Sequence, residues 1–132
     1  MVHDEHTSAR FREALNGMPG ISEKRMMGGL VFMLNGNMLG GAHREKTGER
    51  FFMFRVGNER LQEALNRPHT RPVQFGDRRP LSGFIFVEAD AIEASDLRAW
   101  IELALSNVSA MPAKGDPGQA ARRRDRAKSL KP

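Results

Sequence analysis

The sequence contains no cysteine among its 132 residues. Disulfides, thiolate metal sites and cysteine nucleophiles are therefore excluded, and the composition suits a reducing compartment. No stretch approaches the roughly 20 apolar residues of a membrane-spanning helix. The polar, acidic start of the chain also lacks the cationic and apolar regions of a signal peptide. We therefore expect a cytoplasmic protein without a membrane span.

The net charge of +5 is distributed unevenly along the chain. Residues 1–110 hold 14 Lys and Arg and 14 Asp and Glu, whereas residues 111–132 hold seven basic residues and two acidic ones. A 39% hydrophobic share is enough for one core. The second segment has no apolar periodicity and contains several Pro and Gly, so it buries too little surface to repay its ordering entropy. We predict one neutral domain, residues 1–110, and a disordered basic tail, residues 111–132.

Helical periodicity of apolar residues occurs in three stretches. The first is predicted over residues 8–18, with Thr7 or Ser8 as N-cap. The second is short, begins at an Asn58 cap and ends before Pro68. The third begins at a Ser95 cap and carries the longest apolar stripe, which comprises Leu97, Trp100, Ile101, Ala104, Leu105 and Val108.

Strands are predicted between these helices. Two of them, residues 30–34 and 38–42, flank an Asn-Gly turn and form a hairpin. Apolar runs over residues 51–56 and 83–87 indicate inner strands, and weaker candidates cover residues 22–27 and 73–75. The resulting order, α-β-β-β-β-α-β-β-α, predicts an α+β fold with a mainly antiparallel sheet and helices packed against it in two layers.

The run from residue 25 to residue 38 resembles the signature of the TfoX/Sxy N-terminal domain family of bacterial competence regulators. That signature is Met-Phe-Gly-Gly, an apolar strand and an Asn-Gly turn. It is matched by Met26, Gly28, Gly29, Asn35 and Gly36, with Met27 where the family usually has Phe. Further matches follow in order at residues 53–57 and 81–84 and at Leu97 and Trp100. The resemblance covers residues 8–110.

This resemblance implies a fold similar to that of secretion chaperones and a role in transcription regulation. Full-length competence regulators carry a second, helical domain, so the chain is expected to be a stand-alone N-terminal domain. It would act through a protein partner, and the edge strands of its sheet could be covered in a homodimer.

Few residues offer catalytic or ligand chemistry. Gly28 and Gly29 could cradle an anion with backbone N–H groups, but no P-loop or dinucleotide-binding pattern accompanies them, so we favour a kink between strands. Gly40 and Gly41 indicate a bulge or close packing. The four histidines lack metal-ligand spacing and are expected to be mostly solvated. Ser82 fits a turn, not a nucleophile. We predict no metal, no cofactor and no enzyme.

Arg55 is the charged residue of most interest within the domain. Strand alternation places it on one face with Phe51 and Met53, so its guanidinium either leaves at the strand end or is partly buried with a partner. We favour a structural ion pair. In the alternative, Arg55 lines an anion-binding cleft with Arg25 or Arg44.

The tail is the best candidate for nucleic-acid contact. Its cations include Arg122, Arg123, Arg124, Arg126 and Lys128, and such a cluster predicts non-specific, salt-sensitive binding to phosphates. It has no aromatic residues for base stacking, and a solubilising tail without a partner is the alternative. The leading hypothesis is a non-enzymatic regulatory or adaptor module. The second is a domain that binds a small molecule or anion between sheet and helices.

Overall fold

The computed structural model of the chain describes residues 2–26, 28–74 and 77–114. In chain order the elements are α1 (Glu5–Ala14), β1 (Ile21–Met26), β2 (Gly29–Leu34), β3 (Asn37–Arg44), β4 (Arg50–Arg55), α2 (Asn58–Leu65), β5 (Thr70–Pro72), β6 (Phe84–Glu88), a single 3-10 turn η1 (Ala89–Ala91) and α3 (Ala94–Val108). The predicted order of helices and strands, and with it the α+β class, is confirmed.

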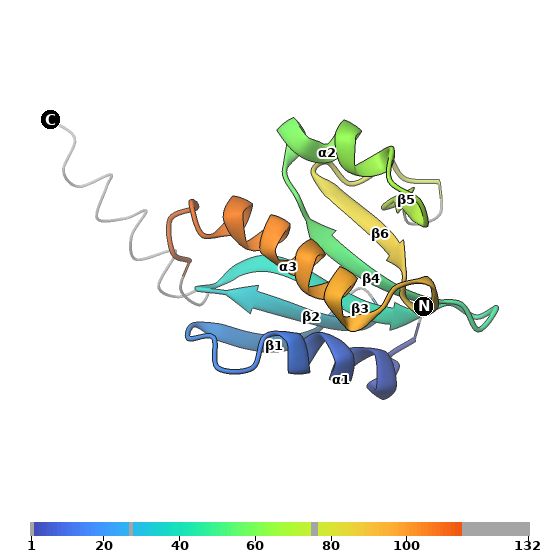
Figure 1. Ribbon diagram of the computed structural model, residues 1–132, viewed down its shortest axis with the longest axis horizontal. Coiled ribbons are helices and arrows are strands. Elements are labelled where there is room, and N and C mark those ends of the chain that lie inside the picture. Colours follow the sequence, from blue (N-terminus) through green and yellow to red (C-terminus); the bar gives the residue numbers. More distant parts are fainter. Residues whose placement is uncertain (1, 27, 75–76, 115–132) are drawn as a thin grey trace, which may run out of the picture.

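The six described strands form one sheet in the order β1-β2-β3-β4-β6-β5, and every neighbouring pair is antiparallel. The helices lie against one face of this sheet, with α3 over its middle and α2 near β5 and β6 (Figure 1), while α1 contacts β3, β4 and α3. The amino end belongs to the same unit, because the backbone of Val2 exchanges hydrogen bonds of 2.8 and 2.9 Å with Arg44 at the end of β3.

The predicted hairpin joins β2 to β3. Asn35 and Gly36 both have positive φ angles, 51° and 81°, as a two-residue turn between twisted strands requires. The register shifts opposite Phe32 and Met33, so β3 has a bulge beside Gly40. A Cβ at Gly40 would collide with the carbonyl oxygen of Met53, so glycine lets the two strands and α1 pack closely here.

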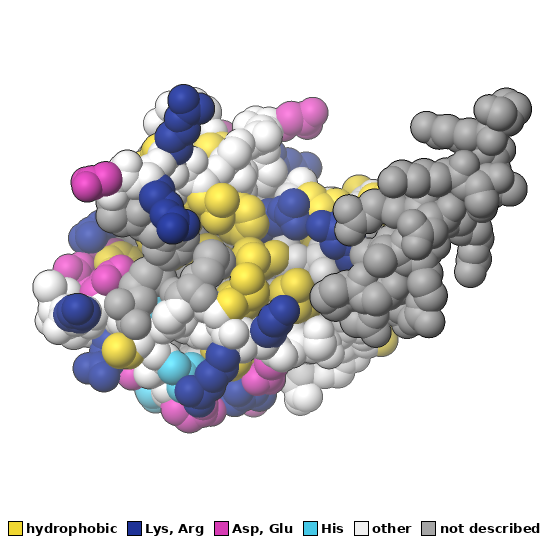
Figure 2. Space-filling view, turned by 180° about the vertical axis from the view of Figure 1, so that it is seen from behind, with side chains coloured by type: hydrophobic (Ala, Val, Ile, Leu, Met, Phe, Trp, Pro, Cys, Tyr) yellow, Lys and Arg dark blue, Asp and Glu magenta, His cyan; other side chains and the backbone are white. Residues whose placement is uncertain are grey.

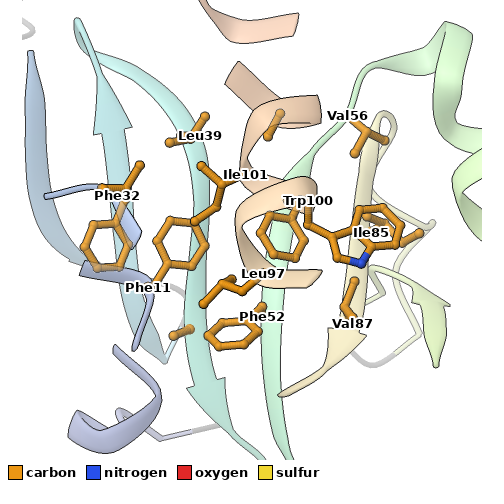
Figure 3. Packing of buried hydrophobic residues seen from close by; sticks show 14 of the residues in the cluster. Phe11, Phe32, Leu39, Phe52, Val56, Ile85, Val87, Leu97, Trp100 and Ile101 are labelled. Carbon is orange, nitrogen blue, oxygen red and sulfur yellow. The ribbon is translucent and has the colours of Figure 1, made fainter. Parts of the chain in front are cut away.

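The main core fills the space between the helices and the sheet (Figure 3). Phe11 of α1 stacks on Phe32 at 4.5 Å and on Phe54 at 5.7 Å between ring centroids, and Phe54 in turn stacks on Trp100 of α3. Both helices are thereby held to the sheet through one chain of aromatic contacts. The predicted stripe of α3 is the face that enters this core.

The first helix differs from the prediction at both ends. Asp4 is its N-cap, and its carboxylate accepts hydrogen bonds from the backbone N–H of Thr7 at 3.1 Å and from the Thr7 hydroxyl at 2.5 Å. Thr7 and Ser8 therefore lie inside α1 and are fully buried, so their prediction as N-caps is wrong. The helix ends at Ala14, and Met18 is exposed.

The predicted caps of the other two helices are also displaced by one or two residues. Gly57, with a φ of 87°, precedes α2, so Asn58 is the first helical residue. Glu93 caps α3 in a reciprocal arrangement with Asp96, which places Ser95 inside the first turn. At α2, Gly57 provides the positive φ angle with which the chain enters the helix. At α3, Glu93 and Asp96 satisfy free backbone N–H groups of the first turn.

The strand predicted at residues 73–75 lies earlier, at Thr70–Pro72. The backbone leaves β6 at Val73, whose carbonyl oxygen accepts a hydrogen bond from the N–H of Leu81 at 2.6 Å. Val73 is fully buried because it turns inward there. Phe75 lies outside the described residues.

After α3 the chain returns to the β2–β3 hairpin. Met111 packs against the main core, the Asn37 side chain donates to the carbonyl oxygen of Pro112 at 2.9 Å, and the N–H of Lys114 donates to the carbonyl oxygen of Asn35 at 2.7 Å. Residues 111–114 thus contact the domain. Of residues 111–132, which were predicted to form a disordered tail, residues 115–132 lie outside the described part.

Candidate functional site

The face of the sheet opposite the helices is called the rear face below. Strand register and alternation place on this face about every second residue of β1, β2, β3, β4 and β6. Its members are Ser22, Lys24 and Met26 of β1, Val31 and Met33 of β2, Met38, Gly41 and His43 of β3, Phe51, Met53 and Arg55 of β4, and Phe84, Phe86 and Glu88 of β6. No helix of the described residues covers this face.

Half of the rear face is a second small core. Phe51, Met53, Phe84 and Phe86 are buried there together with Val73. Val73 and Leu81 belong to the connection between β5 and β6, and both pack against this cluster. The aromatic rings of β4 and β6 are therefore not exposed on the surface.

A strip of methionines borders this second core, and Met38 packs against it. Met33 and Met38 lie opposite each other in the β2–β3 ladder, and both are partly exposed, as is Met26 at the end of β1. Leu81 is also partly exposed. We call these four residues the methionine strip. Figure 2 shows hydrophobic side chains gathered in the middle of this face with Lys and Arg side chains around them.

Basic side chains near the strip lack partners. Lys24, Arg78 and Arg79 are exposed, and none of them makes an ion pair or hydrogen bond through its side chain within the described residues. By contrast, Arg12 on the helical side binds two carboxylates, those of Glu5 and Glu23. The balanced charge of the domain therefore conceals an uneven arrangement in space.

Arg55 reaches the rear face beside Met38. Its guanidinium donates a long hydrogen bond of 3.5 Å to the Met38 carbonyl oxygen and lies 5.5 Å from the centre of the Phe84 ring. A carbonyl and an aromatic ring thus take the place of the predicted carboxylate among the described residues.

The three arginines predicted to share an anion site do not converge. Arg25 and Arg44 lie on the helical side, where Arg25 contacts His3 Nδ1 at 3.3 Å and Arg44 lies 3.6 Å from the Asp4 carboxylate. Arg55 lies on the opposite face and at the opposite end of the strands. No cleft joins them within the described part of the chain.

The glycines of the family signature shape the strands. Gly28 has a φ of 75° in the turn between β1 and β2, which agrees with the kink that we favoured. A Cβ at Gly29 would lie 2.6 Å from the Ala42 carbonyl oxygen, so glycine there allows β2 and β3 to approach closely. Asn35 and Gly36 form the hairpin turn, and Met26 ends β1.

His43 is an exception to the expectation that most of the histidines are solvated. Its ring is 3% exposed and packs against Phe51 and Phe86 at centroid distances of 5.6 and 4.8 Å. Burial lowers the pKa of His43, although Glu45, 3.2 Å from Nε2, opposes that effect. Strand alternation with Gly41 could have indicated an inward position, but the aromatic neighbours come from strands distant in sequence.

A groove between α2 and α3 is a second feature that the sequence did not indicate. Three hollows of about 400, 260 and 370 Å³ follow one another there. Arg60 of α2 and Arg67, two residues beyond the end of that helix, line two of them each. Arg60 donates to the Ser106 hydroxyl at 2.7 Å, and Arg67 lies 4.8 Å above the Trp100 ring.

The family model described as TfoX N-terminal domain matches residues 13–108. The chain belongs to the TfoX N-terminal domain family. The match runs from within α1 to the end of α3, so it covers all six strands. A search of curated proteins and a search of solved structures each found no match.

Other predicted features of this TfoX N-terminal domain stay predictions. The tail residues Arg122, Arg123, Arg124, Arg126 and Lys128 lie outside the described residues. Among the residues that are described, no group of three or more His, Asp or Glu side chains is placed to hold a metal ion. None of the described helices has both the length and the apolar character needed to cross a bilayer.

Proposed function

We propose that this TfoX N-terminal domain is a non-enzymatic, cytoplasmic regulatory or adaptor module that acts by contacting a protein partner. The observation that best supports the proposal is the rear face, where partly exposed methionines lie beside basic side chains without partners. Methionine is flexible and polarizable, and surfaces rich in it adapt to partners. Family membership supports the regulatory part of the proposal.

Transcript profiling tests the regulatory role. Cells that carry the native gene are compared with cells that lack it and with cells that express Met33→Glu. The charged side chain should weaken apolar contact on the rear face, so this variant is expected to reproduce the transcript changes of the deletion. Met18→Glu, at an exposed methionine in the connection between α1 and β1, is the matched control and should behave as wild type. A deletion that changes no transcripts would contradict the proposal.

We also propose that the tail adds non-specific contact with nucleic acid. The test is a gel-shift titration on duplex DNA across salt concentrations. It compares the full-length protein with a variant in which Arg122, Arg123 and Arg124 are replaced by Gln. In a plot of the logarithm of the binding constant against the logarithm of the salt concentration, the slope for the Gln variant should be smaller in magnitude by about 3 than the slope for the full-length protein. Equal slopes would exclude these arginines as phosphate contacts.

A second candidate function is binding of a small anionic molecule in the groove between α2 and α3. The two arginines that line adjacent hollows favour it. Thermal shift against a metabolite library is the test, since a ligand at 100 times its dissociation constant adds roughly 2.7 kcal/mol of stability. The stabilisation should be lost in Arg60→Gln. If no compound of the library stabilises the wild-type protein, this candidate function is contradicted.

A further inference from the structure

We infer that the rear face binds an acidic partner segment that also presents apolar side chains, with the methionine strip as the apolar contact and Lys24, Arg55, Arg78 and Arg79 around it as the basic contacts. The inference rests on the proposed function and adds to it the chemistry of the partner.

The first argument is the segregation of unpaired charge. Lys24, Arg78 and Arg79 are exposed and have no side-chain partner among the described residues, and Asp77, next to Arg78, is the acidic exception. On the helical side the exposed side chains without such partners are mainly acidic, namely Glu13 of α1, Glu59 of α2 and Glu102 of α3, with Arg98 as a basic exception. A segment with carboxylates would therefore be attracted more strongly to the rear face than to the exposed surfaces of α1 and α3.

The second argument is the spacing of the basic residues across the sheet. Lys24 lies on β1 and Arg55 on β4, three strand spacings apart, which is about 14 Å. Met33 and Met38 occupy the two strands between them. A short segment that crosses the strip can thus place apolar side chains on the methionines while carboxylates on either side approach a cation.

The third argument separates a protein partner from a nucleic acid. Single-stranded nucleic acids bind sheet faces through bases stacked on exposed aromatic rings. On the rear face the rings of Phe51, Phe84 and Phe86 are buried in the second core, and the accessible apolar atoms described there belong to methionines and Leu81. These contacts suit aliphatic side chains of a peptide.

The test uses the full-length protein and a short fluorescein-labelled peptide of alternating leucine and glutamate as the probe. Fluorescence anisotropy measures the affinity, and backbone amide NMR shifts locate the site. Two variants probe the site, each with a matched control: Arg79→Glu with Arg98→Glu, and Met33→Gln with Met18→Gln. Each control makes the same chemical change at a side chain away from the rear face. Circular dichroism establishes that all four variants are folded.

We expect binding with shifts centred on β1 to β4 and on residues 77–81, and roughly three- to tenfold weaker affinity for Arg79→Glu and for Met33→Gln. Both controls should bind as wild type does. Equal affinities for all variants would overturn the inference, as would shifts confined to residues 115–132 or to the helices. Equal binding of a serine–glutamate peptide would also overturn it, since charge alone would then suffice.

A single-stranded DNA oligonucleotide is the remaining comparison. If it displaces the peptide from the same amides with higher affinity, the rear face is a nucleic-acid site and the inference is wrong. The peptide experiment is independent of the transcript experiment. If the Met33→Glu cells lose regulation but the purified protein does not bind the peptide, the inference of an acidic partner is wrong, whereas the proposed regulatory function is still supported.

Discussion

His43 couples the stability of the domain to pH. Burial among aromatic rings lowers its pKa in the folded state, so the unfolded chain, with an ordinary value of 6.5, binds the proton more readily. Stability should therefore fall as pH falls below about 6.5, until the pKa of the folded state is reached. Urea unfolding at about pH 7.5 and about pH 5.5 measures the effect.

The matched pair of variants for this prediction is His43→Phe and His69→Gln. Removing the buried imidazole should flatten the pH dependence across that window. His69 is half exposed and paired with Glu88, so its replacement should keep the dependence that His43 causes. A wild-type protein equally stable at both pH values would contradict the assignment.

Gly40 is a position where a single methyl group should be costly. Its φ lies outside the left-handed region, so the penalty of Gly40→Ala comes from collision of the new Cβ with the Met53 carbonyl oxygen and the Phe11 ring. Overpacking of this kind costs about 1–3 kcal/mol. Chemical denaturation checks the value, and an unchanged free energy of unfolding would show that β3 and β4 can separate without cost.

Sequence reasoning succeeded for residues whose role is local. The Asn35-Gly36 turn follows from the positive φ angles that these two residue types tolerate. It failed where neighbouring polar residues competed, as with Asp4, Thr7 and Ser8 at the start of α1, because any of them can cap a helix. It also failed for His43, whose burial depends on strands remote in sequence.

At the scale of elements, Arg10 fastens α1 to the turn η1. Its two terminal nitrogens donate to the carbonyl oxygens of Ala89 and Ile92, both at 2.8 Å, and its guanidinium lies 5.0 Å from the Phe52 ring centre. Lysine cannot reproduce this planar fork. Arg10→Lys should therefore lower stability by about 1–2 kcal/mol.

Thermal or urea unfolding measures this loss, and hydrogen exchange should show faster opening around η1. Arg98→Lys is the control, because Arg98 is exposed and has no side-chain partner within the described residues. Equal stability of the two variants would show that the Arg10 contacts contribute nothing measurable.

Strand order could be anticipated only in part. The meander β1-β2-β3-β4 follows from short connections between adjacent strands, as expected for antiparallel neighbours. The position of β6 between β4 and β5 has no local signal, since it depends on α2 carrying the chain past the end of β4. The groove between α2 and α3 is a product of that crossing, which is why neither Arg60 nor Arg67 was singled out.

At the scale of the whole molecule, residues 111–114 should contribute to stability. A chain ending at Ala110 loses the packing of Met111 and leaves the buried Asn37 amide without its acceptor. We expect it to be about 1–3 kcal/mol less stable than a chain ending at Lys114. Urea denaturation of both chains is the measurement. Identical urea midpoints for the two chains would show that the contacts of residues 111–114 do not stabilise the domain.

Total charge was a poor guide to the surface of the domain. Equal numbers of basic and acidic residues in residues 1–110 indicated a neutral surface. Folding separates many of them: Lys24 and Arg55 lie on the rear face by strand register, and Arg78 and Arg79 belong to the β5–β6 connection, which packs on that face through Val73 and Leu81. Only the strand register reveals this arrangement.

The pairing of Val2 with Arg44 has a practical consequence for anyone who labels the molecule. A fluorescent protein or affinity tag fused to the amino end would be joined next to a hydrogen-bonded strand pair and close to Asp4, which starts α1. Such a fusion would place the attached protein against both the first turn of α1 and the end of β3, where it could disturb the hydrogen bonds between Val2 and Arg44. Tags belong at the other terminus, eighteen residues beyond Lys114, the last described residue, whose N–H donates to Asn35 in the hairpin turn.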